Sequence, residues 1–184
     1  MAEHTVQLFE NEKDCCGCSA CLNTCPKGAI EMREDSFGFT YPFIRQELCI
    51  GCEKCLQVCH FQNKESLHQP LAAYAAAAKN QNTLYGSASG GAFACAAEKI
   101  IGQGGIVFGA AFEKDGHILK PQHRKADALQ DIKHLQGSKY VQSAIDSAYR
   151  DTKAALKQGK TVLFSGTPCQ IDGLYGFLGR DYDN

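Results

Sequence analysis

Two closely spaced runs of cysteine constrain this chain more than any other feature of its sequence. The first run has the spacing C-x2-C-x2-C-x3-C, is followed by Pro26, and consists of Cys15, Cys18, Cys21 and Cys25. The second run repeats that spacing 34 residues later, is followed by His60, and consists of Cys49, Cys52, Cys55 and Cys59. Nine of the 11 cysteines lie between Cys15 and Cys59. A disulfide scaffold would spread its cysteines through the chain, so this distribution predicts a metal-binding module joined to a cysteine-poor domain.

The spacing is typical of bacterial ferredoxins, in which such runs ligate [4Fe–4S] clusters. Three closely spaced thiolates hold one face of a cubane, and in two-cluster ferredoxins the fourth cysteine of each run ligates the other cluster. The sequence therefore predicts two [4Fe–4S] clusters with exchanged fourth ligands. One predicted set is Cys15, Cys18, Cys21 and Cys59, and the other is Cys49, Cys52, Cys55 and Cys25.

Zinc is the competing interpretation of the cysteine runs. Structural zinc sites usually pair cysteines across a longer loop, with four ligands per ion, whereas two triplets with a delayed fourth cysteine fit cubanes better. Cys16 is interpreted as a small apolar neighbour of the cluster and not as a ligand. His60 is interpreted as a structural replacement for proline, although its ring could donate a hydrogen bond that tunes the cluster potential.

The composition excludes several other classes of protein. Hydrophobic residues make up 44% of the 184 residues, enough for a packed core, so wholesale disorder is excluded. A net charge of -1 gives no basic surface for nucleic acid or for an anionic membrane. The apolar stretches 71–78 and 100–112 are too short or too glycine-rich to span a bilayer, and the N-terminus does not read as a secretory signal. We expect a cytoplasmic protein, whose reduced thiols favour metal ligation over disulfides.

The chain is expected to form two domains, a two-cluster ferredoxin-like domain at 1–65 and a second domain at 66–184. Residues 1–10 are predicted as a short strand or arm, and 63–70 as a polar linker. Between the cysteine runs, 29–34 and 38–43 alternate well enough for a two-stranded hairpin that turns near 35–38. So small a module buries little surface, and cluster ligation would therefore supply much of its folding free energy.

The second domain alternates strand-like and helix-like segments, which predicts an α+β fold with an α/β-like sheet and flanking helices. Strands are predicted at 71–78, 106–112, 116–122 and 161–165, the last of them in the interior of the sheet. Helices are predicted at 87–101, 126–135 and 145–158 and near 173–179, the first opening at Ser87 or Ser89. Cys95 is expected in the core, and His117, His123 and His134 are expected on the surface.

Three segments of the second domain have the chemistry of an anionic-cofactor site. Residues 87–91 open a predicted helix, whose free N–H groups and dipole attract negative charge. Residues 137–140 add flexible backbone, a cation and an aromatic face, and 165–170 lie between a strand and a helix, where open sheets bind ligands. Each segment also has an ordinary structural interpretation, as helix caps, a solvated lysine and a buried cysteine.

Taken together, these segments resemble the coenzyme F-420 hydrogenase/dehydrogenase beta-subunit family. The motifs are Ser89-Gly90-Gly91-Ala92-Phe93, Gly137-Ser138-Lys139-Tyr140-Val141 and Ser165-Gly166-Thr167-Pro168-Cys169-Gln170. With the ferredoxin module in front, the resemblance covers nearly the whole chain. Members of that family are iron–sulfur flavoproteins, usually with FAD, that pass electrons between clusters and a two-electron carrier or substrate such as the deazaflavin. They usually continue beyond the helix that follows the last motif, so we expect this chain to be a truncated member carrying the N-terminal part of the flavin-linked domain.

The resemblance implies a FAD site with specific contacts. The flavin pyrophosphate is expected at the backbone of 89–91, with Lys139 as the compensating cation and Tyr140 either stacked on the ring or filling the core. Thr167 and Gln170 are expected to hydrogen-bond the ring or the ribityl chain. The full set of expected cofactor contacts is Ser89, Gly90, Gly91, Gly137, Ser138, Lys139, Tyr140, Gly166, Thr167, Pro168, Cys169 and Gln170. No catalytic residue is assigned.

The leading functional hypothesis is an iron–sulfur flavoprotein oxidoreductase that passes electrons between two [4Fe–4S] clusters and a flavin. Its expected partners are a redox partner protein or subunit and a small-molecule electron carrier or substrate. The first alternative is a non-enzymatic electron-transfer subunit or ferredoxin-like carrier that docks a redox partner. The second alternative is a ferredoxin-tethered structural or regulatory module.

Overall fold

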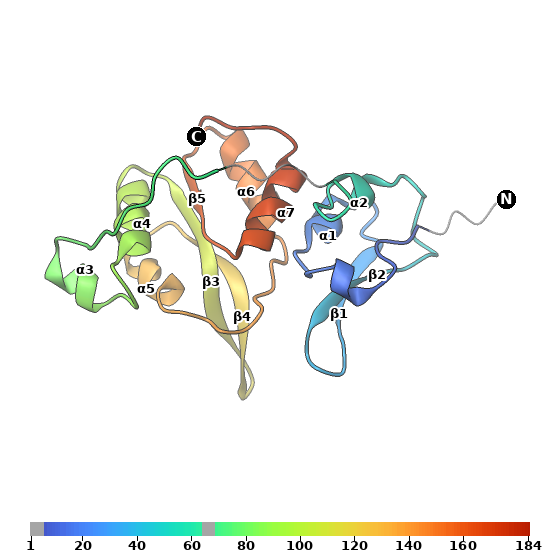
Figure 1. The fold of residues 1–184 in the computed structure, drawn as a ribbon, viewed down its shortest axis with the longest axis horizontal. Coiled ribbons are helices and arrows are strands. Elements are labelled where there is room, and N and C mark those ends of the chain that lie inside the picture. The colour runs from blue at the N-terminus through green and yellow to red at the C-terminus, as the bar shows by residue number, and fades with distance from the viewer. Residues whose placement is uncertain (1–5, 64–68) are drawn as a thin grey trace. The chain divides into compact units, whose positions relative to one another are not determined.

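The computed structural model describes residues 6–63 and 69–184, and within them the chain packs as two compact units (Figure 1). The first unit combines 6–63 with Ile145–Tyr149 and Thr167–Asp181, and the second combines 69–144 with Arg150–Gly166 and Tyr182–Asn184. Of the predicted arm and linker, 1–5 and 64–68 lie outside the described residues. Residues 6–10 are irregular, so of the two predicted alternatives the strand is wrong for them, and the arm is the one that fits. The boundary between domains at 65 and 66 stays a prediction.

The first unit is built on a hairpin and three short helical turns. Strands β1 (Ile30–Glu34) and β2 (Thr40–Ile44) pair antiparallel, with Ile30 opposite Ile44, which confirms the predicted hairpin. The turn is closed by Asp35, whose Oδ1 accepts hydrogen bonds from the backbone N–H groups of Phe37 and Phe39 at 2.8 and 2.9 Å. The helical turns are η1 (Glu12–Asp14), α1 (Ala20–Thr24) and α2 (Lys54–Gln57). The small core consists of Val6, Leu8, Ile30, Ile44 and Cys55.

Helix α7 (Pro168–Leu178) also belongs to the first unit, where it packs on α1 (Figure 1). Its start is specified by a capping box, in which the Thr167 and Gln170 side chains each bind the backbone of the other residue, and by a proline in the first turn. Its end is Gly179, whose φ of 69° suits glycine. These features confirm the helix predicted near residues 173–179.

Two glycines let α7 approach the cysteine module closely. A Cβ at Gly173 would lie 2.9 Å from Cys18 Sγ, and a Cβ at Gly176 would lie 2.5 Å from the backbone oxygen of Val58. Both distances are shorter than a real Cβ contact, so larger residues would push the helix away. The packing of α7 onto the ferredoxin-like module was not predicted from the sequence.

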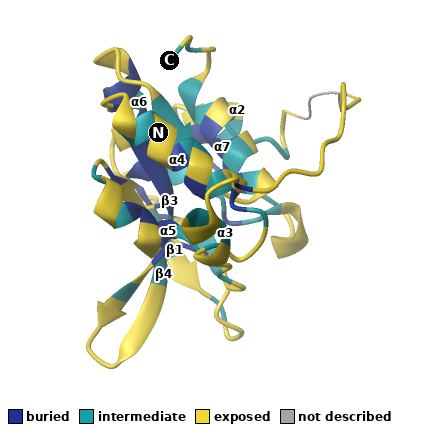
Figure 2. Cartoon of the chain, turned by 90° about the vertical axis from the view of Figure 1, so that its left-hand side faces the viewer, coloured by how far each residue is buried: buried dark blue, intermediate teal, exposed yellow. Residues whose placement is uncertain are grey.

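The second unit contains a three-stranded sheet in the order β4-β3-β5. Strands β3 (Ile106–Asp115) and β4 (Ile118–Ala126) form an antiparallel hairpin, which confirms the two predicted strands. Strand β5 (Val162–Phe164) pairs parallel to β3. Among the described residues β5 lies at an edge of the sheet, so the predicted interior position is wrong. Figure 2 shows that the end of the β3–β4 hairpin is exposed.

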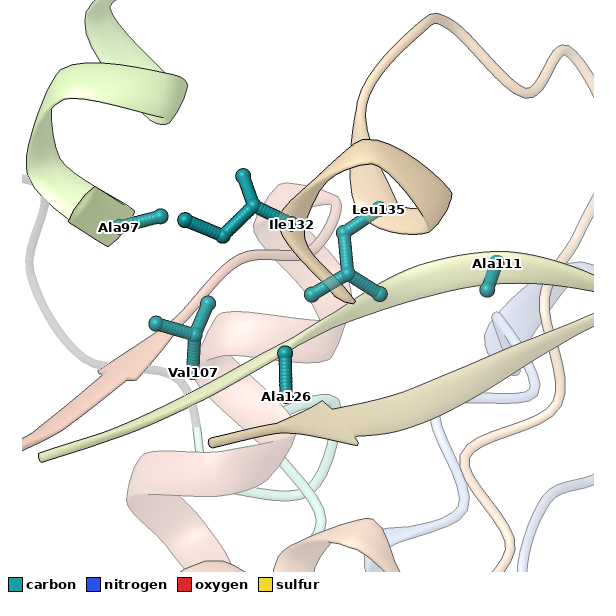
Figure 3. Packing of buried hydrophobic residues seen from close by; sticks show 6 residues of the cluster. All are labelled: Ala97, Val107, Ala111, Ala126, Ile132 and Leu135. Atoms are coloured by element: carbon teal, nitrogen blue, oxygen red, sulfur yellow. The ribbon is translucent and has the colours of Figure 1, made fainter. Parts of the chain in front are cut away.

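The helices of the second unit are α3 (Gln81–Tyr85), α4 (Ala92–Gly102), η2 (Leu129–Asp131), α5 (Ile132–Leu135) and most of α6 (Ala148–Lys157). Helices α4 and α5 cover the sheet through small and branched side chains (Figure 3). The buried cluster consists of Ala97, Val107, Ala111, Ala126, Ile132 and Leu135. Gly159, with φ of 76°, follows the end of α6, near the end of the helix predicted at 145–158.

Two sequence predictions fail around the start of α4. The helix begins at Ala92 and not near Ser87 or Ser89, because Gly91 adopts φ of 80° and interrupts the helical backbone. The predicted strand at 71–78 is irregular, and all of it except Ala78 is exposed. The backbone N–H of Ala78 instead donates to the Gly90 carbonyl at 2.7 Å, so this stretch braces the loop before α4. Cys95, predicted in the core, lies exposed on α4.

No helix in the described part of the chain has the length and apolar character needed to cross a membrane.

Candidate metal centre

The two cysteine runs fold into the same backbone shape, as their sequence repeat predicts. Gly17 and Gly51, which hold equivalent places 34 residues apart, have φ of 64° and 65°. The next equivalent pair, Ser19 and Glu53, has φ of 63° and 57°, and each residue precedes a short helix. Left-handed backbone at two non-glycine residues is uncommon. Its recurrence at equivalent positions shows that the two loops share one backbone conformation.

Each loop borders one cavity, and each cavity also receives a cysteine from the other run. The first cavity encloses about 400 Å³ including its open mouth, and the cluster-spaced cysteines on its wall are Cys15, Cys18, Cys21 and Cys59. The second encloses about 360 Å³ on the same measure, and its cysteines are Cys25, Cys49, Cys52 and Cys55. The members of these two groups are the same as those of the two predicted ligand sets, whose role as cluster ligands stays a prediction. Four cysteines per cavity is the number of thiol ligands that a cubane cluster requires.

Burial favours the neutral form of three of the cavity thiols, Cys15, Cys21 and Cys55. Burial raises the pKa of Cys15 to about 11 and of Cys21 to about 12, and it also raises the pKa of Cys55. Metal ligation needs thiolates, so binding must release protons. The Gly17 N–H points at Cys15 Sγ at 3.4 Å, and the Ala29 N–H points at Cys25 Sγ at 3.3 Å. Such N–H groups stabilise negative charge on sulfur and so favour the ligating form.

Cys16 and His60, interpreted from the sequence as a bystander and a proline replacement, lie together on the wall of the first cavity. Cys16 Sγ is 3.9 Å from His60 Nε2, and these two atoms lie within 4.8 Å of Cys18 Sγ. The Cys16 pKa is raised, first by a hydrogen bond with Cys18 and then by burial. In the sequence, the Cys15–Cys16 doublet is the feature that indicates an extra thiol at the first cavity, one more than a cubane needs.

Comparison with protein families supports the iron–sulfur interpretation of this module. A family model described as a 4Fe-4S dicluster domain matches residues 14–63. The chain carries a 4Fe–4S ferredoxin-type domain. This match and the cysteine cavities support binding of 4Fe–4S clusters and iron–sulfur electron transfer. Comparison with curated proteins found no match.

The second unit holds two of the three segments predicted to contact a flavin. Gln136 Nε2 lies 3.4 Å from Ser87 Oγ, which brings the loop before α4 close to the loop after α5. Lys139 Nζ donates to the backbone oxygens of Gln136 and His134 at 2.6 and 3.3 Å, and burial lowers its pKa. Tyr140 is 93% exposed, so it does not fill the core. Gly137 and Ser138 are also exposed.

The Ser89–Gly91 backbone is already engaged within its own unit. A Cβ at Gly90 would lie 2.2 Å from the backbone oxygen of Ala76, so this glycine is needed for the contact between residues 76–78 and the loop. Gly91 is buried, and its φ of 80° would strain the backbone of any other residue at this position. The glycines therefore have a structural explanation, and the predicted pyrophosphate contact stays a prediction.

The third segment is divided between the two units. Gly166 belongs to the second unit, whereas Thr167, Pro168, Cys169 and Gln170 belong to the first. The Gln170 side chain is buried, and its Oε1 accepts a hydrogen bond from the Thr167 N–H at 3.0 Å. The Gln170 carbonyl accepts from Tyr149 Oη at 2.7 Å. Thr167 and Gln170 thus serve the start of α7, and their predicted flavin contacts remain untested.

His123, predicted on the surface, is buried in the second unit at 6% exposure. Its Nε2 lies 3.0 Å from the Ser165 carbonyl oxygen and its Nδ1 lies 3.1 Å from Ser143 Oγ. The ring also stacks on Phe164. A carbonyl only accepts hydrogen bonds, so Nε2 carries the proton and Nδ1 accepts from the serine. Burial lowers the His123 pKa and keeps the ring neutral. The surface prediction relied on charged neighbours, but Arg124 and Lys125 are exposed whereas His123 is buried.

Proposed function

We propose that this chain is an iron–sulfur electron-transfer protein that holds two [4Fe–4S] clusters with exchanged fourth ligands. The observation that carries the proposal is the grouping of the cysteines around two cavities, with Cys59 in the first and Cys25 in the second. The ligands proposed for the first cluster are Cys15, Cys18, Cys21 and Cys59. The ligands proposed for the second cluster are Cys25, Cys49, Cys52 and Cys55.

The chain's own residues would set the properties of these sites. Bound clusters supply one-electron redox chemistry. Apolar walls lower the local dielectric, and Leu8, Phe9 and Ile44 provide them here. The N–H groups of Gly17 and Ala29 aim at ligand sulfurs, and such hydrogen bonds favour the more negative, reduced state of a cluster.

Anaerobic reconstitution tests this proposal. The full chain should bind about eight iron and about eight sulfide ions, as two cubanes require. It should show charge-transfer absorption that bleaches on reduction, together with EPR signals of reduced cubanes. Zinc retained in place of iron, or iron without acid-labile sulfide, would refute the proposal.

A second candidate is a flavin-linked oxidoreductase like the coenzyme F-420 hydrogenase/dehydrogenase beta subunits, which the three motifs resemble. The observation in its favour is the hydrogen bond between Gln136 and Ser87, which gathers two of the three motif-bearing loops in one unit. The exposed ring of Tyr140 lies on one of these loops and is free to stack on an aromatic ligand. The Ser89–Gly91 backbone fits less well because Ala76 fills the space beside Gly90. We therefore assign no reaction step to a flavin.

Flavin content distinguishes the second candidate from a simple electron carrier. Anaerobically purified protein is denatured, and the released flavin is counted by fluorescence. Tyr140→Ala should lower the flavin content if that ring stacks on the cofactor, whereas Tyr85→Ala removes a similarly exposed ring on α3 and should not. Gly91→Val is a poor test, because the φ of 80° makes any such variant strained. Absence of flavin, with both clusters present, would favour a carrier that docks a redox partner.

We further propose that the natural partner is a redox protein or subunit, or a small two-electron carrier, and that the protein works in the cytoplasm. The support for the last point is the set of free thiols, which a reducing compartment preserves.

A further inference from the structure

The two cysteine loops share a backbone conformation but differ in exposure. Residues 16–20 of the first loop are buried or half-buried, whereas the equivalent residues 50–54 of the second loop are exposed, except for the half-buried Gly51. The thiols at equivalent positions differ in the same way, because Cys18 is half-buried and Cys52 is exposed. Among the proposed cluster ligands, only Cys52 is exposed. The second site is therefore the one with a ligand sulfur at the surface.

Helix α7 accounts for this difference. It packs on α1, which follows the first loop, and a Cβ at Gly173 would lie 2.9 Å from Cys18 Sγ. The first loop consists of small residues that allow this contact, in the order Cys-Gly-Cys-Ser-Ala. The second loop has the larger residues Ile-Gly-Cys-Glu-Lys, and none of them is buried. The first loop is therefore covered by a helix of its own unit, and the second loop is left open.

The mouth of the second cavity combines an apolar side chain with charged groups. Ile50, which is 59% exposed, lines this cavity together with Cys52. The charged residues on the cavity wall are all exposed, and they are Lys27, Glu53 and Lys54. None of these three forms an ion pair with any described residue. Small surfaces of this composition suit the transient complexes through which redox proteins exchange electrons.

The charged groups on the two cavity walls differ in sign. The described residues that line the second cavity include two lysines and one carboxylate, whereas those that line the first include the carboxylate of Asp14 and neither lysine nor arginine. A cubane held by four thiolates is itself negatively charged. The lysines of the second cavity offset this charge, so an acidic protein surface meets less repulsion there than at the first cavity.

We propose that the second cluster exchanges electrons with a partner protein, and that this partner is a one-electron carrier with acidic groups around its own cofactor. This inference rests on the proposed function, since it requires a cluster at the second cavity. The partner's carboxylates pair with Lys27 and Lys54, and its surface covers Ile50, which brings its cofactor close to Cys52. One electron passes between the cluster and the carrier, so one is oxidised as the other is reduced, and no bond forms or breaks.

Lysine footprinting tests the docking surface without measuring electron transfer. The probe is cytochrome c whose lysines have been succinylated, which makes the carrier acidic and unreactive toward amine reagents. The reconstituted full chain is acetylated at low ionic strength with and without this probe, and its peptides are analysed by mass spectrometry. Acetylation of Lys27 and Lys54 should be lost when the probe is present. Lys13, an exposed lysine of the same unit that precedes the first cysteine run, should react as before. Equal protection of Lys13, or protection of none of the three, would overturn the proposal.

Electron-transfer rates test the same surface with two probes of opposite charge. The reduced chain is mixed in a stopped-flow instrument with succinylated cytochrome c or with the unmodified, basic form. Lys27→Glu/Lys54→Glu should slow the reaction of the succinylated form by about tenfold at low ionic strength and should accelerate that of the basic form. A shifted cluster potential would change both rates in the same direction, so opposite changes report docking. Lys13→Glu is the matched control and should change neither rate.

Salt dependence distinguishes an acidic partner from a basic one. The rate with succinylated cytochrome c should fall as the ionic strength rises, because salt screens an attraction. A rate that rises with salt for the succinylated form and falls for the basic form would indicate a basic partner and overturn the proposal.

Iron, sulfide and EPR signals are measured on the same samples. Two clusters, together with rates that do not respond to Lys27→Glu/Lys54→Glu, would overturn this inference and leave the proposed function standing. A chain that assembles no clusters would refute the proposed function and the electron exchange with it.

Discussion

The close approach of α7 to the cysteine module predicts a specific cost for enlarging Gly176. An alanine Cβ there would lie 2.5 Å from the Val58 backbone oxygen, and backbone cannot yield as the end of a flexible side chain can. Overpacking of this kind costs about 1–3 kcal/mol. Replacing glycine by alanine within a helix stabilises the helix by roughly 1 kcal/mol. Because the contact is so short, we take the upper part of the overpacking range and subtract the gain in helix propensity. We therefore expect Gly176→Ala to lower the free energy of unfolding by about 1–2 kcal/mol.

Gly102→Ala is the matched control for this prediction. Gly102 is also near the end of an 11-residue helix, but a Cβ there meets nothing within 4 Å. Gly102→Ala should raise the free energy of unfolding by up to about 1 kcal/mol. Urea unfolding of the reconstituted proteins, followed by far-ultraviolet circular dichroism, reports the helices of both units. With a slope of about 2 kcal/mol/M, Gly176→Ala should lower the midpoint by about 0.5–1 M. A midpoint equal to or above that of Gly102→Ala would refute the packing argument.

Three further predictions follow from single contacts and shifted pKa values. Tyr149→Phe removes the hydroxyl that donates to the Gln170 carbonyl at 2.7 Å, and should lower the free energy of unfolding by about 1 kcal/mol; an unchanged urea midpoint would contradict this. Burial raises the pKa of Cys15 to about 11 and of Cys21 to about 12 from an ordinary value of 9.0, so thiols of the unfolded chain ionise first as the pH rises. Cluster-free protein should therefore lose stability between about pH 9 and about pH 12, and equal urea midpoints at the two ends of that range would be evidence against buried neutral thiols. Burial lowers the pKa of His123 below 6.5, so acid favours the unfolded chain. Stability should fall as the pH drops below about 6.5, and less in His123→Gln than in the unmodified chain; parallel curves would show that His123 does not cause the loss.

The elements that the sequence predicts best are those specified by local signals. The cysteine spacing anticipated two equivalent loops, since ligand geometry leaves few other backbone paths for three nearby thiols. The hairpins at 30–44 and 106–126 follow from alternating side chains with turn residues between them. Thr167, Pro168 and Gly179 mark the ends of α7 through capping, which needs no information from the rest of the fold.

The failures occur where distant parts of the chain decide the outcome. No residue near Ala72–Ala78 in the sequence indicates that this stretch hydrogen-bonds to Gly90. A segment with β propensity forms a strand only where another strand pairs with it, and this stretch pairs with none among the described residues. The position of β5 at the sheet edge depends on pairing across about 55 residues. The close approach of α7 to Cys18 depends on tertiary packing at Gly173, and nothing in the local sequence indicates that contact. The cofactor contacts at 89–91 were predicted from small residues, and Gly90 and Gly91 are instead required by the packing of the chain itself.

The central claim is that two cubane clusters share the two cysteine runs through exchanged fourth ligands, and one comparison tests it most directly. Cys25→Ser and Cys59→Ser are reconstituted anaerobically, and the EPR spectrum of each reduced protein is compared with that of the unmodified chain. Cys25→Ser should damage the cluster held by Cys49, Cys52 and Cys55 and preserve the signal of the other, and Cys59→Ser should do the reverse. If each substitution instead damages the cluster of its own run, so that Cys25→Ser removes the signal that Cys15→Ser also removes, the exchanged-ligand assignment is wrong.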